Sequence, residues 1–330
     1  MDIIYVEPRY FLFAKPLFYQ FAFILLTMNN SILPPNRSIT LEEQGPRDGW
    51  QVEKKWIPTQ MKVEYIHKLV DAGLKRIQVT SFVNPQYVPQ MADADAVAKA
   101  IHKKQGVVYS ALVLNTKGVV RAAEAGLNHL SVSLSASNTH SLKNTNKTIE
   151  ASKVEFADMV RQARSAGVAV RAGVQCAFGC RYEGAVPPQT VLDLVKHQLD
   201  LGVDEISLAD STGMANPAAV QQMMAQVVEL AGARTVHLHL HDTEGKGLAN
   251  LLAAYQVGVF HFDTAFGGLG GCPFIAGATG NIATEDVVNM LHQMGIETGI
   301  DVALLIAAAR DFEVFLDKKL PGKIKDVLFI

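Results

Sequence analysis

The segment VHLHLHDTEGKGLANLLAAYQVGVFHFDTAF, residues 236–266, contains a strand pattern, a helix pattern and a second strand pattern in that order. VHLHLH alternates apolar and polar residues, as a half-buried β-strand does. GLANLLAAYQVG has the apolar spacing of a helix and ends at Gly258, a residue suited to a helix C-cap. FHFDTAF returns to a strand pattern from Phe260. A strand–helix–strand unit of this length predicts two parallel strands of one sheet.

The same alternation runs through the chain from Ile39 onward. Eight β-rich runs begin at Ile39, Arg76, Val107, His129, Val168, Glu205, Val236 and Phe260. Helical patterns lie between them, and two of these end at Gly73 and Gly202. Eight such units predict an α/β fold of the (β/α)8 TIM-barrel type, which typically needs about 250 residues. We therefore predict a single barrel domain over residues 39–330, with a C-terminal helical extension.

An open doubly wound sheet is the alternative fold for this alternation. That fold predicts a G-x-G-x-x-G turn after the first strand, where it binds phosphate groups. The corresponding turn reads QGPRDGWQ, residues 44–51, and lacks the pattern. The barrel is therefore the preferred prediction.

Residues 1–38 are predicted to form an N-terminal arm outside the barrel. Residues 1–27 are apolar and aromatic, but the apolar run Leu17–Leu26 is shorter than the roughly 20 residues that span a bilayer. We interpret residues 1–27 as a start-site artefact, with translation beginning at Met28. A peripheral membrane anchor is the alternative, and no stable membrane insertion is expected.

The composition excludes several classes of partner. The chain has 30 Lys+Arg and 32 Asp+Glu, a net charge of -2, which provides no basic surface for a nucleic acid. Three cysteines in 330 residues fit a reducing compartment, so we predict a cytoplasmic protein. Homodimerisation is left open.

In a TIM barrel the active site lies at the C-terminal ends of the strands. His239 and His241 are two residues apart on a strand, so their imidazoles point to one face near its end. Asp48 follows the first strand and can meet them across the barrel mouth, whereas His237 is expected deeper, within the packed interior. Two imidazoles and a carboxylate predict a divalent cation site, with Mg²⁺ or Mn²⁺ as a Lewis acid. A non-haem Fe(II) oxygenase site is the alternative on ligand chemistry alone.

The loop GGLGGCPFIAGATGNIATED, residues 267–286, follows the eighth strand. Its glycines favour mobility and close approach to a ligand. Cys272 is a candidate acid, base or nucleophile there, because a nearby cation lowers a thiol's pKa. Asn281 can offer an amide oxygen to the metal, and Thr284 is expected to N-cap the next helix. The pair Cys176 and Cys180 is interpreted as structural, since a lone C-x3-C is weak evidence for zinc.

Several motifs together resemble the 3-hydroxy-3-methylglutaryl-CoA (HMG-CoA) lyase family, over about residues 41–320. They are GPRDGWQ at Gly45, TSFVNPQYVPQM at Thr80, CAFGCRYEG at Cys176, EISLADSTG at Glu205, HLHDTEGKGLAN at His239 and the glycine loop at Gly267. The resemblance implies Asp48, His239, His241 and Asn281 as ligands of one Mg²⁺ or Mn²⁺. It further implies Arg47 and Cys272 as catalytic residues, with His239 also in proton transfer.

Two residues depart from the family pattern. Gln78 stands where the family usually has Glu, and Trp50 where relatives tend to have Leu, whereas the acid Glu43 is retained. Both departures predict a reshaped substrate pocket. Further pocket candidates stand at the ends of the predicted strands, namely Arg171, Asp210 and Thr212.

The chemistry implied by the resemblance is cleavage of a 3-hydroxyacyl-CoA to acetyl-CoA and a 3-oxo acid such as acetoacetate. Arg47 would stabilise negative charge on the thioester oxygen, and Cys272 would protonate the enolate carbon. Two alternatives remain: an acyl-CoA condensing or transfer enzyme on the same barrel, and a weakly active paralogue that binds CoA esters.

Overall fold

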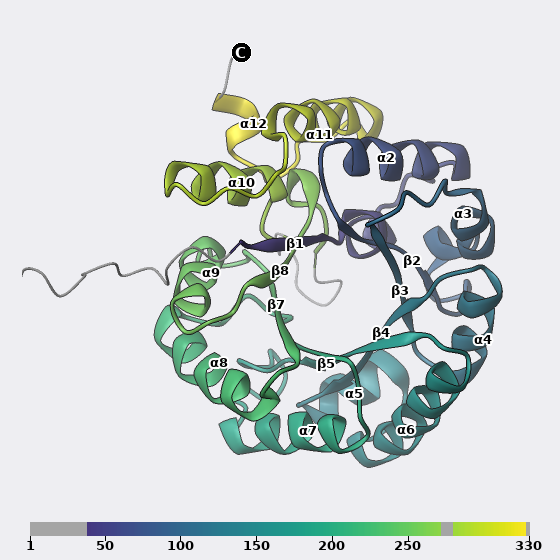
Figure 1. Ribbon diagram of the computed structural model, residues 1–330, viewed down its shortest axis with the longest axis vertical. Coiled ribbons are helices and arrows are strands. Elements are labelled where there is room, and N and C mark those ends of the chain that lie inside the picture. The colour runs from purple at the N-terminus through teal and green to yellow at the C-terminus, as the bar shows by residue number, and fades with distance from the viewer. Residues whose placement is uncertain (1–37, 272–279, 328–330) are drawn as a thin grey trace, which may run out of the picture. The chain divides into compact units, whose positions relative to one another are not determined.

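The computed structural model describes residues 38–271 and 280–327, and it confirms the predicted barrel. Parallel strands close in chain order, with β8 paired to β1 (Figure 1). The strands of this described part are β1 Thr40–Glu43, β2 Arg76–Phe82, β3 Val108–Val113, β4 His129–Ser135, β5 Ala169–Gln175, β6 Glu205–Asp210, β7 Thr235–Leu240 and β8 His261–Thr264. Each lies within or beside one of the eight predicted runs.

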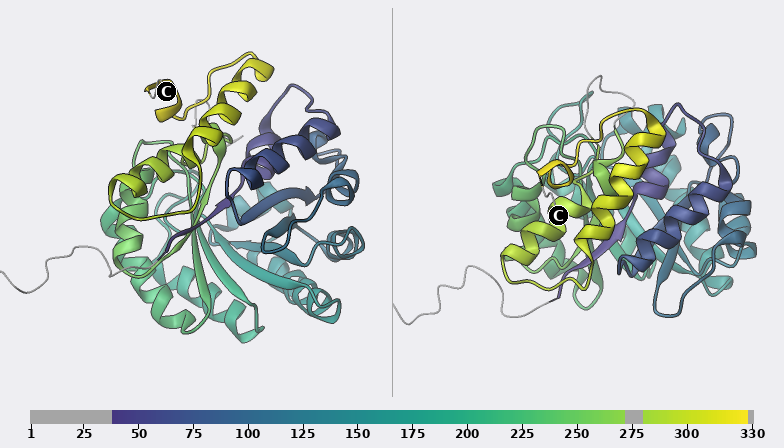
Figure 2. Two further views of the ribbon diagram at one scale, coloured as in Figure 1. Left: turned by 45° about the horizontal axis from the view of Figure 1, so that its top comes forward. Right: turned by 90° about the horizontal axis from the view of Figure 1, so that it is seen from above.

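Helices follow the strands and cover the outside of the barrel (Figures 1 and 2). They are α2 Thr59–Asp71, α3 Ala94–Ala100, α4 Thr116–Glu124, α5 Asn138–Thr145, α6 Ile149–Ser165, α7 Pro188–Asp200, α8 Pro217–Ala231 and α9 Gly247–Gln256. After β8 come α10 Thr284–Gln293, α11 Val302–Leu316 and α12 Ile324–Val327. Helix α11 packs beside α2 and α10, so the C-terminal helices complete the ring of helices next to β1.

Glycine ends the helices at the predicted places. Gly73, Gly202 and Gly258 follow α2, α7 and α9 with φ angles of 104°, 74° and 97°. A side chain is disfavoured in this left-handed region, whereas glycine enters it at little cost. Each glycine therefore turns the chain from a helix towards the next strand.

Two irregular segments shape the C-terminal end of the barrel. The β2–β3 register shifts between Gln78 and Thr80, as in a β-bulge, which re-aims neighbouring side chains. Beyond β8, the chain returns to pair Asn281 with His241 and Ala283 with Ala265. The segment that carries Asn281 is therefore held against the end of β7.

The expected cap at Thr284 is corrected by the structure. The N-cap of α10 is Ala283, and Thr284 is the first helical residue. Its hydroxyl donates to Glu43 Oε2 at 2.6 Å instead of bonding the helix backbone. Thr284 is fully buried, and its hydroxyl therefore joins the start of α10 to the buried carboxylate of Glu43.

The N-terminal predictions are not tested by the fold. Residues 1–37 lie outside the described residues, so the arm and the start at Met28 stay predictions. Within residues 38–271 and 280–327, none of the helices combines the length and the apolarity needed to cross a membrane.

Candidate active site

Arg47 and Asp48 lie on a tight turn directly after β1. Residues Gly45–Gly49 form one π-helical turn, a conformation frequent at functional sites. The turn starts at a fixed point, because Gly45 N donates to Glu43 Oε1 at 2.7 Å. Residue 45 is also too crowded for a side chain, since an added Cβ would lie 2.6 Å from the Phe266 ring. The local backbone thus sets where Arg47 and Asp48 point.

Asp48 meets His239 and His241 at the barrel mouth, as predicted. One ligand atom from each of these side chains lies within 4.8 Å of the others, and all three residues are buried. The two imidazole rings are 5.1 Å apart between centroids. His241 Nε2 is 3.6 Å from Asp48 Oδ2. The strand β7 and the turn after β1 therefore bring their side chains to one point.

Asn281 completes this group from the segment paired with β7. Its Nδ2 donates to Asp48 Oδ2 at 2.8 Å and to the Leu269 carbonyl at 3.0 Å. These bonds turn the amide so that Oδ1 is buried, and no hydrogen-bond donor reaches Oδ1 among the described residues. A buried acceptor without a donor is costly unless something electropositive binds it.

The four side chains fit a divalent cation. They offer a carboxylate, an amide oxygen and two imidazoles, a mixed N/O set that suits such ions. Burial would raise the pKa of Asp48, but Arg47 and His241 outweigh burial, so the pKa lies well below its usual range. Asp48 is therefore an anion across the physiological range and ready to bind a cation.

Arg47 is held by acceptors along its guanidinium. Nε donates to Gln78 Oε1, Nη1 to Asp48 Oδ1 and Nη2 to Gln44 Oε1 at 3.2 Å. Gln78 itself donates from Nε2 to Ser131 Oγ at 2.9 Å and is fully buried. Its position beside the β2 bulge aims it at Arg47. The guanidinium is thus fixed before any ligand binds.

Asp263 lies beside His239, on the neighbouring strand β8, and contacts it. His239 Nδ1 is 3.1 Å from Asp263 Oδ2, and Arg171 contacts the same carboxylate with Nη1 at 2.8 Å and Nη2 at 3.3 Å. Burial would raise the pKa of Asp263, but Arg171 and His239 lower it well below its usual range. The sequence placed Arg171 at the pocket; the structure places it in this buried ionic layer.

A second cluster of metal-type ligands lies deeper and is filled by that arginine. Glu42, His237 and Asp263 bring ligand atoms together. Arg171 Nη1 lies between them, 3.2 Å from Glu42 Oε2 and 3.3 Å from His237 Nδ1. A guanidinium therefore supplies the positive charge here, and His237 belongs to the interior as predicted.

Glu43 is buried beneath the mouth and joins three site segments. Its carboxylate accepts hydrogen bonds from Gly45 N, from Phe266 N at 2.9 Å and from the Thr284 hydroxyl. Burial raises the pKa of Glu43 to about 7, against the effect of these donors. Glu43 is fully buried, so its carboxylate joins these segments and is not exposed at the mouth.

The other pocket candidates have structural contacts. Asp210 accepts from Met214 N and Ala215 N, both at 3.1 Å, and burial raises its pKa. The Thr212 hydroxyl donates to the Gly179 carbonyl at 3.4 Å.

Trp50 points away from the mouth. Its side chain is fully buried in the apolar core, with its ring 6.0 Å from that of Phe312 on α11. A large ring directly after the Arg47–Asp48 turn fills space against the C-terminal helices, so the sequence departure at this position acts through core packing.

The cysteine predictions have different outcomes. Cys272 lies outside the described residues, so its catalytic role stays a prediction. Cys176 and Cys180 are buried, which fits the structural interpretation.

Sequence reasoning missed two residues that support the site. They are Asp263 on β8 and Ser131 on β4. The signal for Ser131 was present in HLSVSLS, where serines take every second position of an inward-facing strand.

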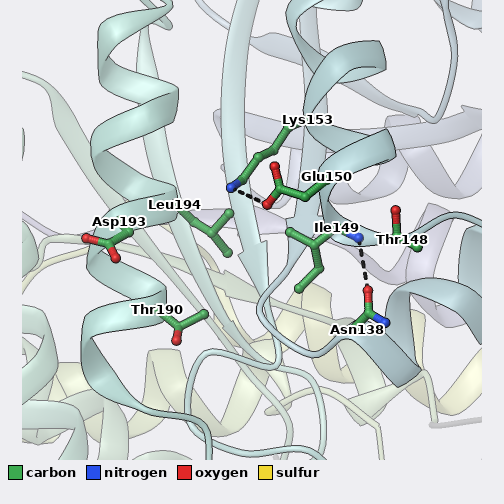
Figure 3. A pocket seen from close by; sticks show the side chains of 8 residues that line it. All are labelled: Asn138, Thr148, Ile149, Glu150, Lys153, Thr190, Asp193 and Leu194. Carbon is green, nitrogen blue, oxygen red and sulfur yellow. Dashed lines mark hydrogen bonds and ion pairs between the residues drawn. The ribbon is translucent and has the colours of Figure 1, made fainter.

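A surface hollow of about 340 Å³ lies elsewhere, between the N-terminal turns of α6 and α7 (Figure 3). Two of its polar groups are engaged in contacts within the hollow. Lys153 pairs with Glu150 at 2.8 Å, and Asn138 Oδ1 accepts from the backbone N–H of Ile149 at 3.1 Å. It contains none of the proposed ligands, so the barrel mouth remains the candidate site.

Comparisons with known proteins agree with this geometry. The HMGL-like family model matches residues 38–312. The hydroxymethylglutaryl-CoA lyase YngG of Bacillus subtilis is 42% identical over 88% of this chain and 97% of its own length. The human cytoplasmic 3-hydroxy-3-methylglutaryl-CoA lyase is 42% identical over 82% of this chain and 73% of its own.

Solved structures give the same result. An HMG-CoA lyase from Acinetobacter baumannii, in complex with coenzyme A and 3-methylmalate, matches with a TM-score of 0.85 and 42% identity. The match covers 88% of this chain and 94% of that one. The HMG-CoA lyase of Bacillus subtilis matches with a TM-score of 0.86 and 41% identity, over 89% and 99% of the two chains.

Proposed function

From the premise that this chain belongs to the HMGL-like family, we propose that it cleaves HMG-CoA or a close 3-hydroxyacyl-CoA analogue. The products are acetyl-CoA and a 3-oxo acid, which is acetoacetate when the substrate is HMG-CoA. The enzyme is a carbon–carbon lyase, and its substrate is an acyl-CoA. The coenzyme A complex of the Acinetobacter relative supports the substrate class.

One observation carries the assignment of the site. Asp48, His239, His241 and Asn281 converge, and the Asn281 Oδ1 atom is buried without a donor among the described residues. We propose that these four side chains hold one Mg²⁺ or Mn²⁺. When bound there, the cation supplies a Lewis acid that makes the substrate's 3-hydroxyl easier to deprotonate.

Arg47 is proposed to stabilise the negative charge that develops on the thioester oxygen. The Arg47 side chain is 12% exposed, and its guanidinium is bonded to Gln78, Asp48 and Gln44. A donor fixed in advance needs no reorganisation as the C2–C3 bond breaks, and such a donor is commonly worth about 3–4 kcal/mol.

Proton transfer completes the proposed reaction. A base removes the 3-hydroxyl proton, the C2–C3 bond breaks, and the thioester enolate takes a proton at carbon. The resemblance implies His239 and Cys272 for these transfers, and both roles stay predictions.

The test is an acetyl-CoA release assay on a panel of 3-hydroxy-3-alkylglutaryl-CoA thioesters. Metal-stripped protein is assayed with and without added Mg²⁺ or Mn²⁺, and we expect cation-dependent release from at least one thioester. Arg47→Lys keeps the positive charge but loses the planar guanidinium with its several fixed donors, so kcat should fall by about 10²–10³-fold. Arg121→Lys, at a half-exposed surface ion pair, is the matched control and should match the parent.

Other outcomes would favour the alternatives. Consumption of acetyl-CoA with a 2-oxo acid, without release from any thioester, would indicate a condensing enzyme. Fe(II)-dependent oxygen uptake would indicate an oxygenase. Binding of CoA esters without turnover would indicate the inactive paralogue.

A further inference from the structure

Two carboxylates inside the barrel each lie between an arginine and a histidine. Asp263 lies between Arg171 and His239. One layer deeper, Glu205 Oε1 and Oε2 are 3.0 and 2.7 Å from Arg76, and Glu205 Oε2 is 3.0 Å from His237 Nε2. Both triads join a carboxylate to an arginine and a histidine, and Glu205 Oε2 also lies 3.2 Å from His129 Nε2. Only the upper histidine, His239, belongs to the proposed cation site.

The backbone fixes the upper contact. His239 and Asp263 are direct partners in the parallel register of β7 and β8, so both side chains enter the barrel at one level. Asp263 is 2% exposed and Arg171 is 4% exposed. The arginine fork binds both carboxylate oxygens, which leaves the Asp263 group little freedom to rotate.

This arrangement sets the proton on the His239 ring. An ionised carboxylate only accepts hydrogen bonds, so the ring must present N–H at Nδ1 towards Asp263 Oδ2. The neutral ring then has its lone pair at Nε2, the form in which an imidazole binds a metal ion.

We propose that Asp263, braced by Arg171, is a positioning residue that holds His239 in the Nδ1–H tautomer with Nε2 presented to the cation. The inference rests on the proposed cation site and adds a residue that none of the proposed ligand or catalytic assignments includes. Asp263 should therefore control the affinity for the cation through its charge and orientation, although it is not itself a ligand.

Asp263→Asn tests this role, because the Arg171 guanidinium favours one orientation of the new amide. We expect the Asn amide oxygen to take the place of Oδ1, 2.8 Å from Arg171 Nη1, because the contact of Nη2 with Oδ2 is longer, at 3.3 Å. Its Nδ2 then donates to His239 Nδ1, which shifts the ring proton to Nε2 and blocks the ligand atom. Geometry is nearly conserved, yet the tautomer is reversed.

The experiment measures Mn²⁺ affinity by calorimetry and His239 tautomer by ¹⁵N NMR on metal-free, histidine-labelled protein. The His239 signals are assigned by their loss in His239→Asn. We expect the Nδ1–H form in the parent and the Nε2–H form in Asp263→Asn, with Mn²⁺ Kd raised by at least about tenfold. The matched control Glu205→Gln alters the lower triad and should keep Kd within about twofold of the parent.

The outcomes separate this inference from the cation site itself. Absence of Mn²⁺ binding in the parent would remove the proposed site. Normal parent binding with an unchanged Kd in Asp263→Asn, or an equal loss in Glu205→Gln, would overturn the role of Asp263 alone. The Nε2–H form in the parent would also overturn it, and that measurement stands even if Asp263→Asn fails to fold.

Discussion

Gln78→Glu restores the acid that the family usually carries, and we expect it to slow this enzyme. Gln78 accepts from Arg47 Nε and donates to Ser131 Oγ, whose hydroxyl can rotate and donate to a carboxylate instead. The hydrogen bonds of the site therefore survive the change. What the substitution adds is one negative charge, fully buried and bonded to the guanidinium of Arg47.

The size of the effect follows from the loss of positive potential at Arg47. Asp48 already neutralises part of that charge. A second carboxylate about 4 Å from the guanidinium centre interacts by about 4 kcal/mol at an effective dielectric of about 20. A preorganised donor stabilises the transition state by about 3–4 kcal/mol. Loss of half of this stabilisation, about 2 kcal/mol, lowers kcat about 30-fold. Binding changes less, because the thioester oxygen carries its full negative charge only in the transition state.

The assay is steady-state kinetics on the thioester that the parent cleaves fastest and on HMG-CoA. Gln44→Glu places the same charge at the other end of Arg47, next to Nη2, and should also lower kcat. Gln198→Glu buries a carboxylate on α7, where the glutamine donates to the Gly173 carbonyl, and controls for the cost of burial. Faster turnover of HMG-CoA by Gln78→Glu would refute the reasoning and indicate a missing catalytic carboxylate.

Further outcomes are expected elsewhere in the chain. His241→Ala should raise the Kd for Mn²⁺ at least about tenfold by titration calorimetry, and an unchanged Kd would exclude it as a ligand. Trp50→Ala should lower the free energy of unfolding, measured by urea denaturation, by about 3–5 kcal/mol, because its ring is fully buried. A change below about 0.5 kcal/mol, the range of an ordinary surface substitution, would contradict that packing. Burial raises the pKa of Glu285 from 4.5 to about 8, so its folded form keeps a proton that the unfolded chain releases. The contribution of Glu285 to the free energy of unfolding is complete below pH 4.5 and is lost as the pH rises to 8. Glu285→Gln should remove this loss, which amounts to about 3 kcal/mol at pH 7. The measurement is urea denaturation of both proteins at several pH values. Deletion of residues 1–27 should leave a folded, active enzyme by circular dichroism and acetyl-CoA release, whereas loss of folding would show that the segment packs on the barrel.

The sequence predicted the strand order and the proposed ligands for the same physical reason. Alternating residues mark which side chains point into a barrel, and the last inward positions of the strands lie at its mouth. His239 satisfies both conditions on β7, His241 directly follows that strand, and Asp48 lies on the turn after β1. Their convergence needs no further information than the closure of β8 onto β1.

Depth along the barrel could not be predicted in this way. Arg171 is the third residue of β5 and lies level with Glu205, the first residue of β6, because neighbouring strands are staggered. It therefore serves the ionic layer below the site, although alternation gives it the same inward direction as a pocket residue. Trp50 shows the complementary case, since a residue after a strand can turn outward to the helices.

The contact between Asp263 and His239 also depends on how neighbouring strands are aligned, so the sequence alone could not predict it. The two residues are separated by 24 positions and a whole helix, and only the register of β7 against β8 sets them at one level. A polar residue on the strand next to a ligand residue, at the same level, can orient that residue without binding the ion itself. Asp263 lies on β8 level with His239, whereas Glu205 contacts His237, two residues earlier on β7 and farther from the mouth. The ligand and its support therefore lie on neighbouring strands at one level. The comparison of Asp263→Asn with Glu205→Gln then measures how far the influence of the site extends into the barrel.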